Sequence, residues 1–171
     1  MPRIQFVMSM LALVLPIAST AQSAIDFAGT WKMDAARSES AHQAVPIGPV
    51  TLIIKQTATE VSIETKRAEA RKSSEILTYK LDGSESTTTG TDGAPIKCKA
   101  HWEGANFITG TTRNIQGATI TTLYVHSLDP TGTELTIHKT LNVQHGYQFE
   151  GAKSYGTGTD VFIRTKAATA K

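Results

Sequence analysis

The stretch that decides the fold runs from residue 96 to residue 142 and consists of four alternating segments separated by turns. The segments read IKCKAHWE (96–103), NFITGTTR (106–113), ATITTLYVHSL (118–128) and TELTIHKTLN (133–142), and the residues between them are GA, NIQG and DPTG. Alternation of apolar and polar residues is typical of β-strands with one buried face. Gly, Asp and Pro between the segments favour turns. The stretch therefore predicts consecutive antiparallel hairpins.

Turns placed at 104–105, 114–117 and 129–132 set the register of these segments. They pair Cys98 with Thr111, Ala100 with Thr109, Trp102 with Phe107, Phe107 with Tyr124, Thr109 with Thr122, Thr111 with Ile120, His126 with Leu135, Tyr124 with Ile137, Thr122 with Lys139 and Ile120 with Leu141. The face on which these residues lie is mainly apolar. The opposite face is polar and carries Lys97, Lys99, His101, Thr112, Thr119, Thr121, Glu134, His138 and Thr140, with Leu123 and Val125 as apolar exceptions.

The rest of the chain continues the strand pattern. Further candidate strands are Val50–Thr57, Glu60–Lys66, Ser74–Lys80, Tyr147–Tyr155 and Asp160–Thr165, after a first strand near Gly29. Helical periodicity is nearly absent, and the polar connection Ser38–Pro49 is the place for a short helix. About nine successive strands with short connections predict an all-β, antiparallel up-and-down meander with little helix. Closure of the meander into a barrel would remove its exposed edges.

Length and charge exclude several classes. The 171 residues contain 17 Lys plus Arg, 15 Asp plus Glu and one Cys, and the formal net charge is +2. So small a charge gives no long-range field for nucleic acid or acidic membranes, and we expect no nucleic-acid partner. One Cys excludes a disulfide framework and a Cys-rich zinc site.

The N-terminus predicts export. Residues 1–21 have the order of a cleavable signal peptide: Arg3, an apolar run over Phe6–Ile17, and small residues up to Ala21. The run is shorter than the roughly 20 residues that span a bilayer, so we expect no transmembrane segment. Residues 22–171 then form one domain that is secreted or periplasmic. No Cys follows the cleavage site, so a lipoprotein anchor is not expected.

Two ends of the chain carry a family resemblance. Gly29-Thr30-Trp31 in the first strand, with Arg164 on the last, resembles the lipocalin and calycin superfamily. The resemblance implies that Trp31 plugs one barrel end and that Arg164 packs across it. The order of four further motifs, at 29–34, 79–85, 102–104 and 132–137, resembles small secreted bacterial lipocalin-like proteins. The Thr-Asp-Tyr motif of lipocalins is missing, because Gly93 follows Thr91-Asp92.

The inward face of the predicted barrel offers a candidate binding site. It mixes large apolar residues with hydroxyls, as ligand cavities do. The candidate lining residues are Trp102, Phe107, Thr109, Thr122, Tyr124, His126, Ile137 and Lys139. Lys139 could pair with an acidic head of a small apolar ligand. The alternative is a filled core in which the hydroxyls bond locally, and eight-stranded barrels do both.

Catalytic and metal motifs are not found. The sequence has no Gly-x-Ser-x-Gly elbow, His-Glu-x-x-His pair or Walker loop, so we expect no catalytic residue, metal or cofactor. Cys98 is interpreted as a small buried residue. Three functions stay open: a small-molecule binder, a filled barrel acting as an envelope interaction or inhibitor module through Leu123, Val125 and the 38–49 loop, and acid–base catalysis by His126 beside Tyr124.

Overall fold

The computed structural model describes residues 25–68, 74–146 and 153–165, so the predicted signal peptide at 1–21 lies outside the described residues. The elements in chain order are β1 (Gly29–Met33), the 3-10 helix η1 (Glu39–His42), β2 (Val50–Gln56), β3 (Glu60–Arg67), β4 (Glu75–Lys80), β5 (Ser86–Thr89), β6 (Pro95–Glu103), β7 (Asn106–Ile115), β8 (Ala118–Leu128), β9 (Glu134–Gln144) and β10 (Lys153–Thr165). The short helix expected within Ser38–Pro49 is confirmed as η1.

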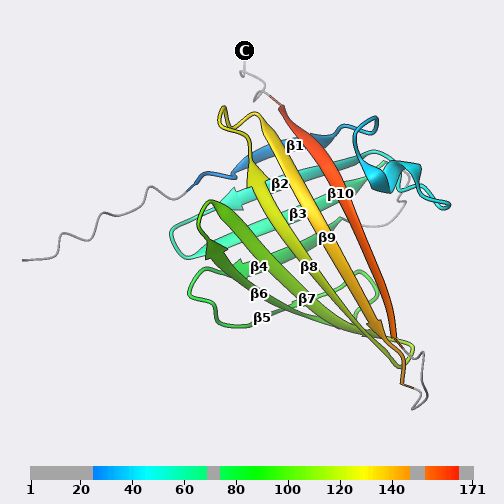
Figure 1. The fold of residues 1–171 in the computed structure, drawn as a ribbon. Helices are drawn as coiled ribbons and strands as arrows, with labels where there is room; N and C mark the ends of the chain where they lie inside the picture. Colours follow the sequence, from blue (N-terminus) through cyan, green and yellow to red (C-terminus); the bar gives the residue numbers. More distant parts are fainter. Residues whose placement is uncertain (1–24, 69–73, 147–152, 166–171) are drawn as a thin grey trace, which may run out of the picture.

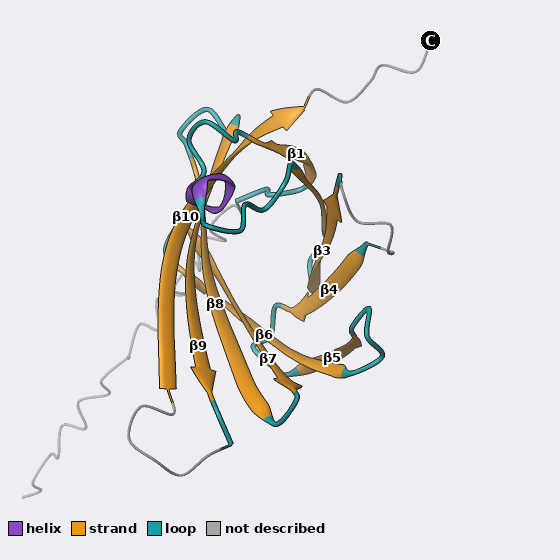
Figure 2. Ribbon diagram, turned by 90° about the vertical axis from the view of Figure 1, so that its right-hand side faces the viewer, coloured by secondary structure: helices purple, strands orange, loops and turns teal. Residues whose placement is uncertain are grey.

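The ten strands form one antiparallel sheet in the order β4-β3-β2-β1-β10-β9-β8-β7-β6-β5. Each strand pairs with its neighbour in sequence, except that β1 also pairs with β10 and that β4 and β5 share no ladder. The sheet curls into a nearly closed barrel whose seam lies between β4 and β5 (Figure 2). Strands β7 to β10 are longer than the others and project beyond β1 to β4 (Figure 1). The all-β meander is thus confirmed.

Two strand predictions need correction. The segment Ser86–Thr89 is a strand that the sequence analysis missed, because its four hydroxyl residues show no apolar alternation. Two separate strands were expected at Tyr147–Tyr155 and Asp160–Thr165. The structure has one continuous strand, β10, from Lys153 to Thr165, and residues 147–152 lie outside the described part. Gly156 and Gly158 do not turn, because the ladder pairs them with Leu141 and Lys139 of β9.

The predicted register is confirmed in the first hairpin and shifted in the next two. The turn at Gly104-Ala105 pairs Trp102 with Phe107 as expected. All the pairs predicted for the second and third hairpins are wrong. They are Phe107–Tyr124, Thr109–Thr122, Thr111–Ile120, His126–Leu135, Tyr124–Ile137, Thr122–Lys139 and Ile120–Leu141. The observed pairs are Phe107–His126, Thr109–Tyr124, Thr111–Thr122, Arg113–Ile120, Leu128–Leu135, His126–Ile137, Tyr124–Lys139, Thr122–Leu141 and Ile120–Val143.

Turn geometry explains both shifts. The second hairpin closes with two residues, Gln116 and Gly117, whose φ values of 49° and 81° suit a tight two-residue turn. The third closes one residue later than expected, because the Asp129 backbone N–H bonds to the Glu134 carbonyl at 3.0 Å. Each shift moves the partner by two residues. Since side chains alternate with a period of two, the inward and outward sets are unchanged.

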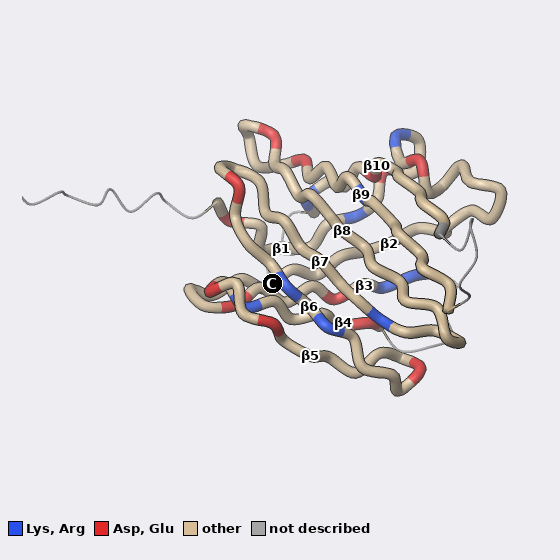
Figure 3. The backbone as a smooth tube through the Cα atoms, turned by 60° about the horizontal axis from the view of Figure 1, so that its bottom comes forward, with Lys and Arg blue, Asp and Glu red and all other residues tan. Residues whose placement is uncertain are grey.

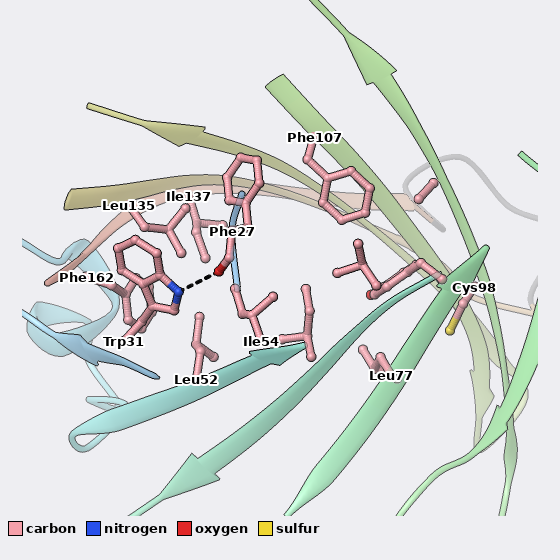
Figure 4. Close-up of a cluster of buried hydrophobic side chains, with 14 of the residues drawn as sticks. Phe27, Trp31, Leu52, Ile54, Leu77, Cys98, Phe107, Leu135, Ile137 and Phe162 are labelled. Carbon is pink, nitrogen blue, oxygen red and sulfur yellow. Dashed lines mark hydrogen bonds between the residues drawn. The ribbon is translucent and has the colours of Figure 1, made fainter. Parts of the chain in front are cut away.

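Aromatic side chains fill one end of the barrel (Figure 4). Trp31 is fully buried, and its Nε1–H donates to the Phe27 carbonyl at 2.9 Å. The ring of Phe107 lies 6.1 Å from that of Phe27 and 5.0 Å from that of Trp102, between centroids. This cluster makes one end of the barrel solid.

Side chains close the seam where the ladder is missing. Ser86 Oγ of β5 donates to the Thr78 carbonyl of β4 at 2.5 Å. Farther along, Arg113 Nη2 of β7 lies 3.1 Å from Glu75 Oε1 of β4, and both side chains are about three-quarters buried. A hydroxyl therefore links the two edge strands where the ladder is missing, and an ion pair links β4 to β7 beyond β5.

The free edge of β10 beyond the short strand β1 is covered by the segment that contains η1 (Figure 2). Ser38 Oγ accepts from the Val161 N–H at 3.0 Å and lies 3.2 Å from the Val161 carbonyl. The Thr159 N–H donates to Glu39 Oε2 at 3.1 Å. Side chains of this segment satisfy edge groups that would otherwise be open to another strand.

Charged residues of both signs are interspersed over the strands and loops (Figure 3). On the outer face, Lys97 Nζ lies 3.2 Å from Glu85 Oε1. Leu123, which was expected to be an outward exception, is 42% exposed, and Val125 is half-buried. None of the helices within residues 25–68, 74–146 and 153–165 is long and apolar enough to cross a membrane.

Candidate functional site

A cavity of about 560 Å³ lies inside the barrel, beyond the aromatic cluster. Its apolar lining consists of Met33, Ile47, Val50, Leu52, Ile63, Leu77, Tyr79, Tyr124, Ile137 and Phe162. Its polar lining consists of Ser40, Thr65, Lys66, Arg67, Ser74, Glu75, Thr91, Thr109, His126, Lys139 and Asp160. The volume is within the range of about 300–1,000 Å³ that small-molecule sites occupy.

Five of the eight predicted lining residues border this cavity, namely Thr109, Tyr124, His126, Ile137 and Lys139. The other three, Trp102, Phe107 and Thr122, do not. Trp102 and Phe107 belong to the aromatic cluster, and Thr122 packs in the ladder between Thr111 and Leu141. The role of all eight in binding stays a prediction.

The sequence analysis missed the opposite wall of the cavity. That wall is formed by Val50 and Leu52 of β2, Ile63 of β3, and Leu77 and Tyr79 of β4. In the sequence VTLIIKQ of β2, apolar residues stand at every second position from Val50 to Ile54, and these three residues are buried. Only the pairing of β1 with both β2 and β10 brings this wall over the β7–β9 hairpins, and no local turn encodes that closure.

The inner end of the cavity is polar but uncharged. His126 Nδ1 lies 3.0 Å from the Phe107 carbonyl, and a carbonyl only accepts, so Nδ1 carries the hydrogen. Burial lowers the pKa of His126 to about 4, so the imidazole is neutral at pH 7. Burial likewise raises the pKa values of Tyr79 and Tyr124.

This environment does not favour acid–base chemistry by His126. Its ring lies 6.1 Å from that of Tyr124, between centroids, and its Nδ1–H is engaged by the backbone. A base with a pKa near 4 is poorly matched to proton abstraction at neutral pH. In the described part of the chain, no three His, Cys, Asp or Glu side chains are grouped so that they could hold a metal.

Charged side chains also line the cavity, and the mouth is here the part of the lining that bears Lys66, Arg67 and Glu75 beside the seam. Glu75 is held by Arg113 across the seam, and Asp160 Oδ1 accepts from the Ser40 N–H at 3.0 Å. The Lys139 side chain has no hydrogen bond or ion pair with any described residue, although both it and Glu39 Oε2 lie beside Gly158 on β10. Lys139 is therefore a cation at the cavity wall that makes no direct ion pair with a described carboxylate.

The opposite end is closed by the two residues that the resemblance singled out. The guanidinium of Arg164 stacks on the Trp31 ring. Its Nη1 donates to the Ala28 carbonyl at 3.1 Å and its Nη2 to the Asp26 carbonyl at 2.9 Å. These bonds hold the segment before β1 across the barrel end, so the cavity does not open on this side.

Solved structures of other proteins show the same architecture. Fatty-acid-binding protein 1 of Echinococcus granulosus superposes with a TM-score of 0.52 at 14% identity, covering 82% of this chain and 98% of that one. Lipid binding protein 8 of Caenorhabditis elegans, in its apo form, gives 0.53 at 13% identity, covering 81% and 95%. The Schistosoma mansoni fatty acid binding protein in complex with arachidonic acid gives 0.50 at 17% identity, covering 82% and 96%.

This chain has a calycin-type barrel fold. Comparison with family models and with curated proteins finds no match. The resemblance drawn from Trp31 and Arg164 is thereby confirmed at the level of the fold. The closer likeness to secreted bacterial proteins stays a prediction. The calycin structures compared above are lipid-binding proteins by their titles, and none is described as an enzyme.

Proposed function

We propose that this calycin barrel binds a small apolar molecule in its internal cavity. The observation that carries the proposal is the cavity of about 560 Å³, which is lined by aliphatic and aromatic side chains together with a similar number of polar ones. Arg164 stacked on Trp31 closes the barrel at one end. The alternative of a filled barrel acting through its exterior requires an interior without such a space. The fold, shared with proteins whose titles name fatty acids and lipids, supports the same proposal.

The ligand is oriented by the distribution of charge along the cavity. The buried His126 is neutral, whereas Lys139 is a cation on the cavity wall with no ion-pair partner among the described residues. A ligand that enters with its apolar chain leading would bury that chain in the cavity and leave its acidic head group near the Lys139 ammonium. Such a charged pair at the rim costs less desolvation than a carboxylate buried at depth.

Native mass spectrometry of the protein purified without detergent tests the proposal directly. We expect a stoichiometric extra mass that solvent extraction identifies as an apolar molecule. Displacement of a dansyl-labelled undecanoic acid then measures affinity. An apo mass together with no binding of the dansyl probe would contradict the proposal.

A pair of tryptophan variants localises the site. Leu77 lines the cavity, whereas its neighbour Ile76 points outward and is 47% exposed. Leu77→Trp fills part of the cavity and should weaken probe binding at least about 10-fold. This is the cost of excluding roughly one to two methylene groups of the probe from the cavity. Ile76→Trp adds the same group outside and should bind like the parent. Equal binding by the two variants would place the site elsewhere.

The head-group assignment has its own test. Lys139→Gln should weaken binding of an acidic probe about 5-fold to 10-fold, as expected for loss of one charge-assisted contact, without affecting the corresponding primary alcohol. Lys97→Gln, on the outer face beside Glu85, is the matched control. We also propose export of the chain, which N-terminal sequencing of the mature protein after residue 21 would establish.

A further inference from the structure

We propose that Tyr79, Thr109 and His126 form a neutral hydrogen-bonding subsite at the inner end of the cavity, and that it receives a hydroxyl group carried by an otherwise apolar ligand. The inference rests on the proposed binding function and specifies the chemistry of the ligand. The three side chains come from β4, β7 and β8, and all three line the cavity.

All three side chains of the subsite are buried. Tyr79 is 1% exposed, Thr109 0% and His126 3%, so their polar atoms have left bulk water. Buried polar groups are nearly always hydrogen-bonded, because an unpaired one costs about 1–3 kcal/mol. Of the three, Thr109 Oγ1 has no hydrogen-bond partner among the described residues, and the His126 ring is paired through Nδ1 only.

The hydrogen-bond inventory shows what is missing. Thr109 Oγ1 makes no hydrogen bond with any residue of the described part of the chain. The Tyr79 hydroxyl faces the Thr109 side chain, and this contact opposes the effect of burial on the Tyr79 pKa. His126 uses Nδ1–H for the Phe107 carbonyl, so Nε2 keeps a free lone pair. The cavity wall thus offers two hydroxyl donors and one acceptor.

The rings of Tyr79 and His126 both pack against the ring of Phe107. The Phe107 ring lies 6.3 Å from the Tyr79 ring and 5.7 Å from the His126 ring, between centroids. Thr109 follows Phe107 by two residues on β7 and therefore points to the same side. The subsite is built on strands of the sheet rather than on loops, so its groups are fixed before a ligand arrives.

A hydroxyl is the ligand group that satisfies this set. It can donate to His126 Nε2 and accept from Thr109 or Tyr79. A carbonyl or ether can only accept, and would leave His126 Nε2 without a donor. A carboxylate is disfavoured, because the protein cations lie at the mouth and an unpaired buried charge is costly. A plain alkyl end leaves Thr109 Oγ1 and His126 Nε2 without a partner. Sites built to bond a hydroxyl discriminate strongly against ligands that lack it.

Matched ligand pairs test the inference. Saturated acids of eight to sixteen carbons, each compared with its ω-hydroxy counterpart, would be titrated against the purified protein by displacement of the dansyl probe. We expect at least one ω-hydroxy acid to bind about 10-fold tighter than its parent. In an ordinary apolar pocket the added hydroxyl would weaken binding. Equal or weaker binding of every ω-hydroxy acid would overturn the inference.

Isosteric variants assign the effect to the subsite. Thr109→Val and Tyr79→Phe should abolish the hydroxyl preference while the parent acids keep their affinity. Thr111→Val is the matched control, because Thr111 is buried on the same face of β7 but does not line the cavity. Retention of the preference by both subsite variants would overturn the inference. If neither acid series binds the unmodified protein, the proposed function itself fails, which separates the two outcomes.

Discussion

The guanidinium carbon of Arg164 lies 4.4 Å from the centroid of the Trp31 ring, so a side chain of the last strand packs on a side chain of the first. The two residues are also direct partners in the β1–β10 ladder. Closure of the barrel and sealing of its end are therefore achieved at one position. The free energy of the stacked cation, about 0.5–2 kcal/mol, is gained only when both ends of the chain are in place.

Arg164→Met should lower the free energy of unfolding by about 2–3 kcal/mol, since it removes the stacked cation and two bonds to carbonyls. Trp31→Ala should cost about 3–5 kcal/mol, the usual cost of deleting a large buried aromatic side chain. Urea unfolding followed by circular dichroism measures both. Lys32→Met, an exposed residue of the same strand, is the control and should change little. An Arg164→Met variant as stable as this control would contradict the sealing role.

The buried His126 makes stability depend on pH. Its pKa is about 4 in the folded protein against 6.5 when solvated, so between these values the unfolded chain binds a proton that the native state excludes. Stability should fall as the pH is lowered from 6.5 to 4, by about 3 kcal/mol in total. His126→Phe should flatten this part of the profile. The measurement is the difference in unfolding free energy between the two proteins at each pH.

Carboxylates act in a lower window. The pKa of Asp129 is held at about 2 by hydrogen bonds from Thr131 and from backbone N–H groups of its turn. Its contribution is present above pH 3.8 and is lost as the pH falls toward 2. The decline between pH 6.5 and 4 therefore reports mainly on histidine. A profile for His126→Phe identical to the parent's would contradict the assignment.

The hairpin stretch shows how much the sequence determines. Alternation over 96–142 predicted which residues face inward, and this set survived register shifts because each shift was even. The shifts themselves arose at Gln116 and Asp129. Non-glycine residues with positive φ, such as Gln116, are uncommon, so a longer loop was the better expectation there.

Closure could not be predicted in the same way. The β1–β10 ladder joins residues about 130 positions apart, and the wall formed by β2 to β4 depends on it. Consequently Thr109, Tyr124, His126, Ile137 and Lys139 could be named as lining residues, but Tyr79 and Leu77 could not. The strand β5 was missed for a related reason: Ser86 bridges the seam, and the four hydroxyl residues of the strand carry no apolar signal.

The ion pair across the seam should contribute measurable coupling. Arg113 and Glu75 are each about three-quarters buried, so their interaction is screened less than that of a surface pair. A double-mutant cycle with Arg113→Met and Glu75→Gln should give about 1 kcal/mol of coupling in urea unfolding. The exposed pair of Lys97 and Glu85 is the control and should give a value near zero. Equal coupling in the two cycles would exclude a special role at the seam.

Cys98 should be unreactive in the native barrel. Cys98 lies on β6, where it pairs with Ser86 of β5, and its side chain is 0% exposed. Burial raises the pKa of its thiol. Both effects lower the concentration of accessible thiolate, which is the reacting species. Ellman's reagent should label the native protein at least about 100-fold more slowly than the urea-unfolded chain, because labelling then requires opening of the sheet. Thr87→Cys in a Cys98→Ala background places a thiol on the exposed side of β5 and should react at once. Native labelling of Cys98 as fast as this control would mean that the seam beside β5 opens freely, and the closed wall on which the cavity depends would have to be abandoned.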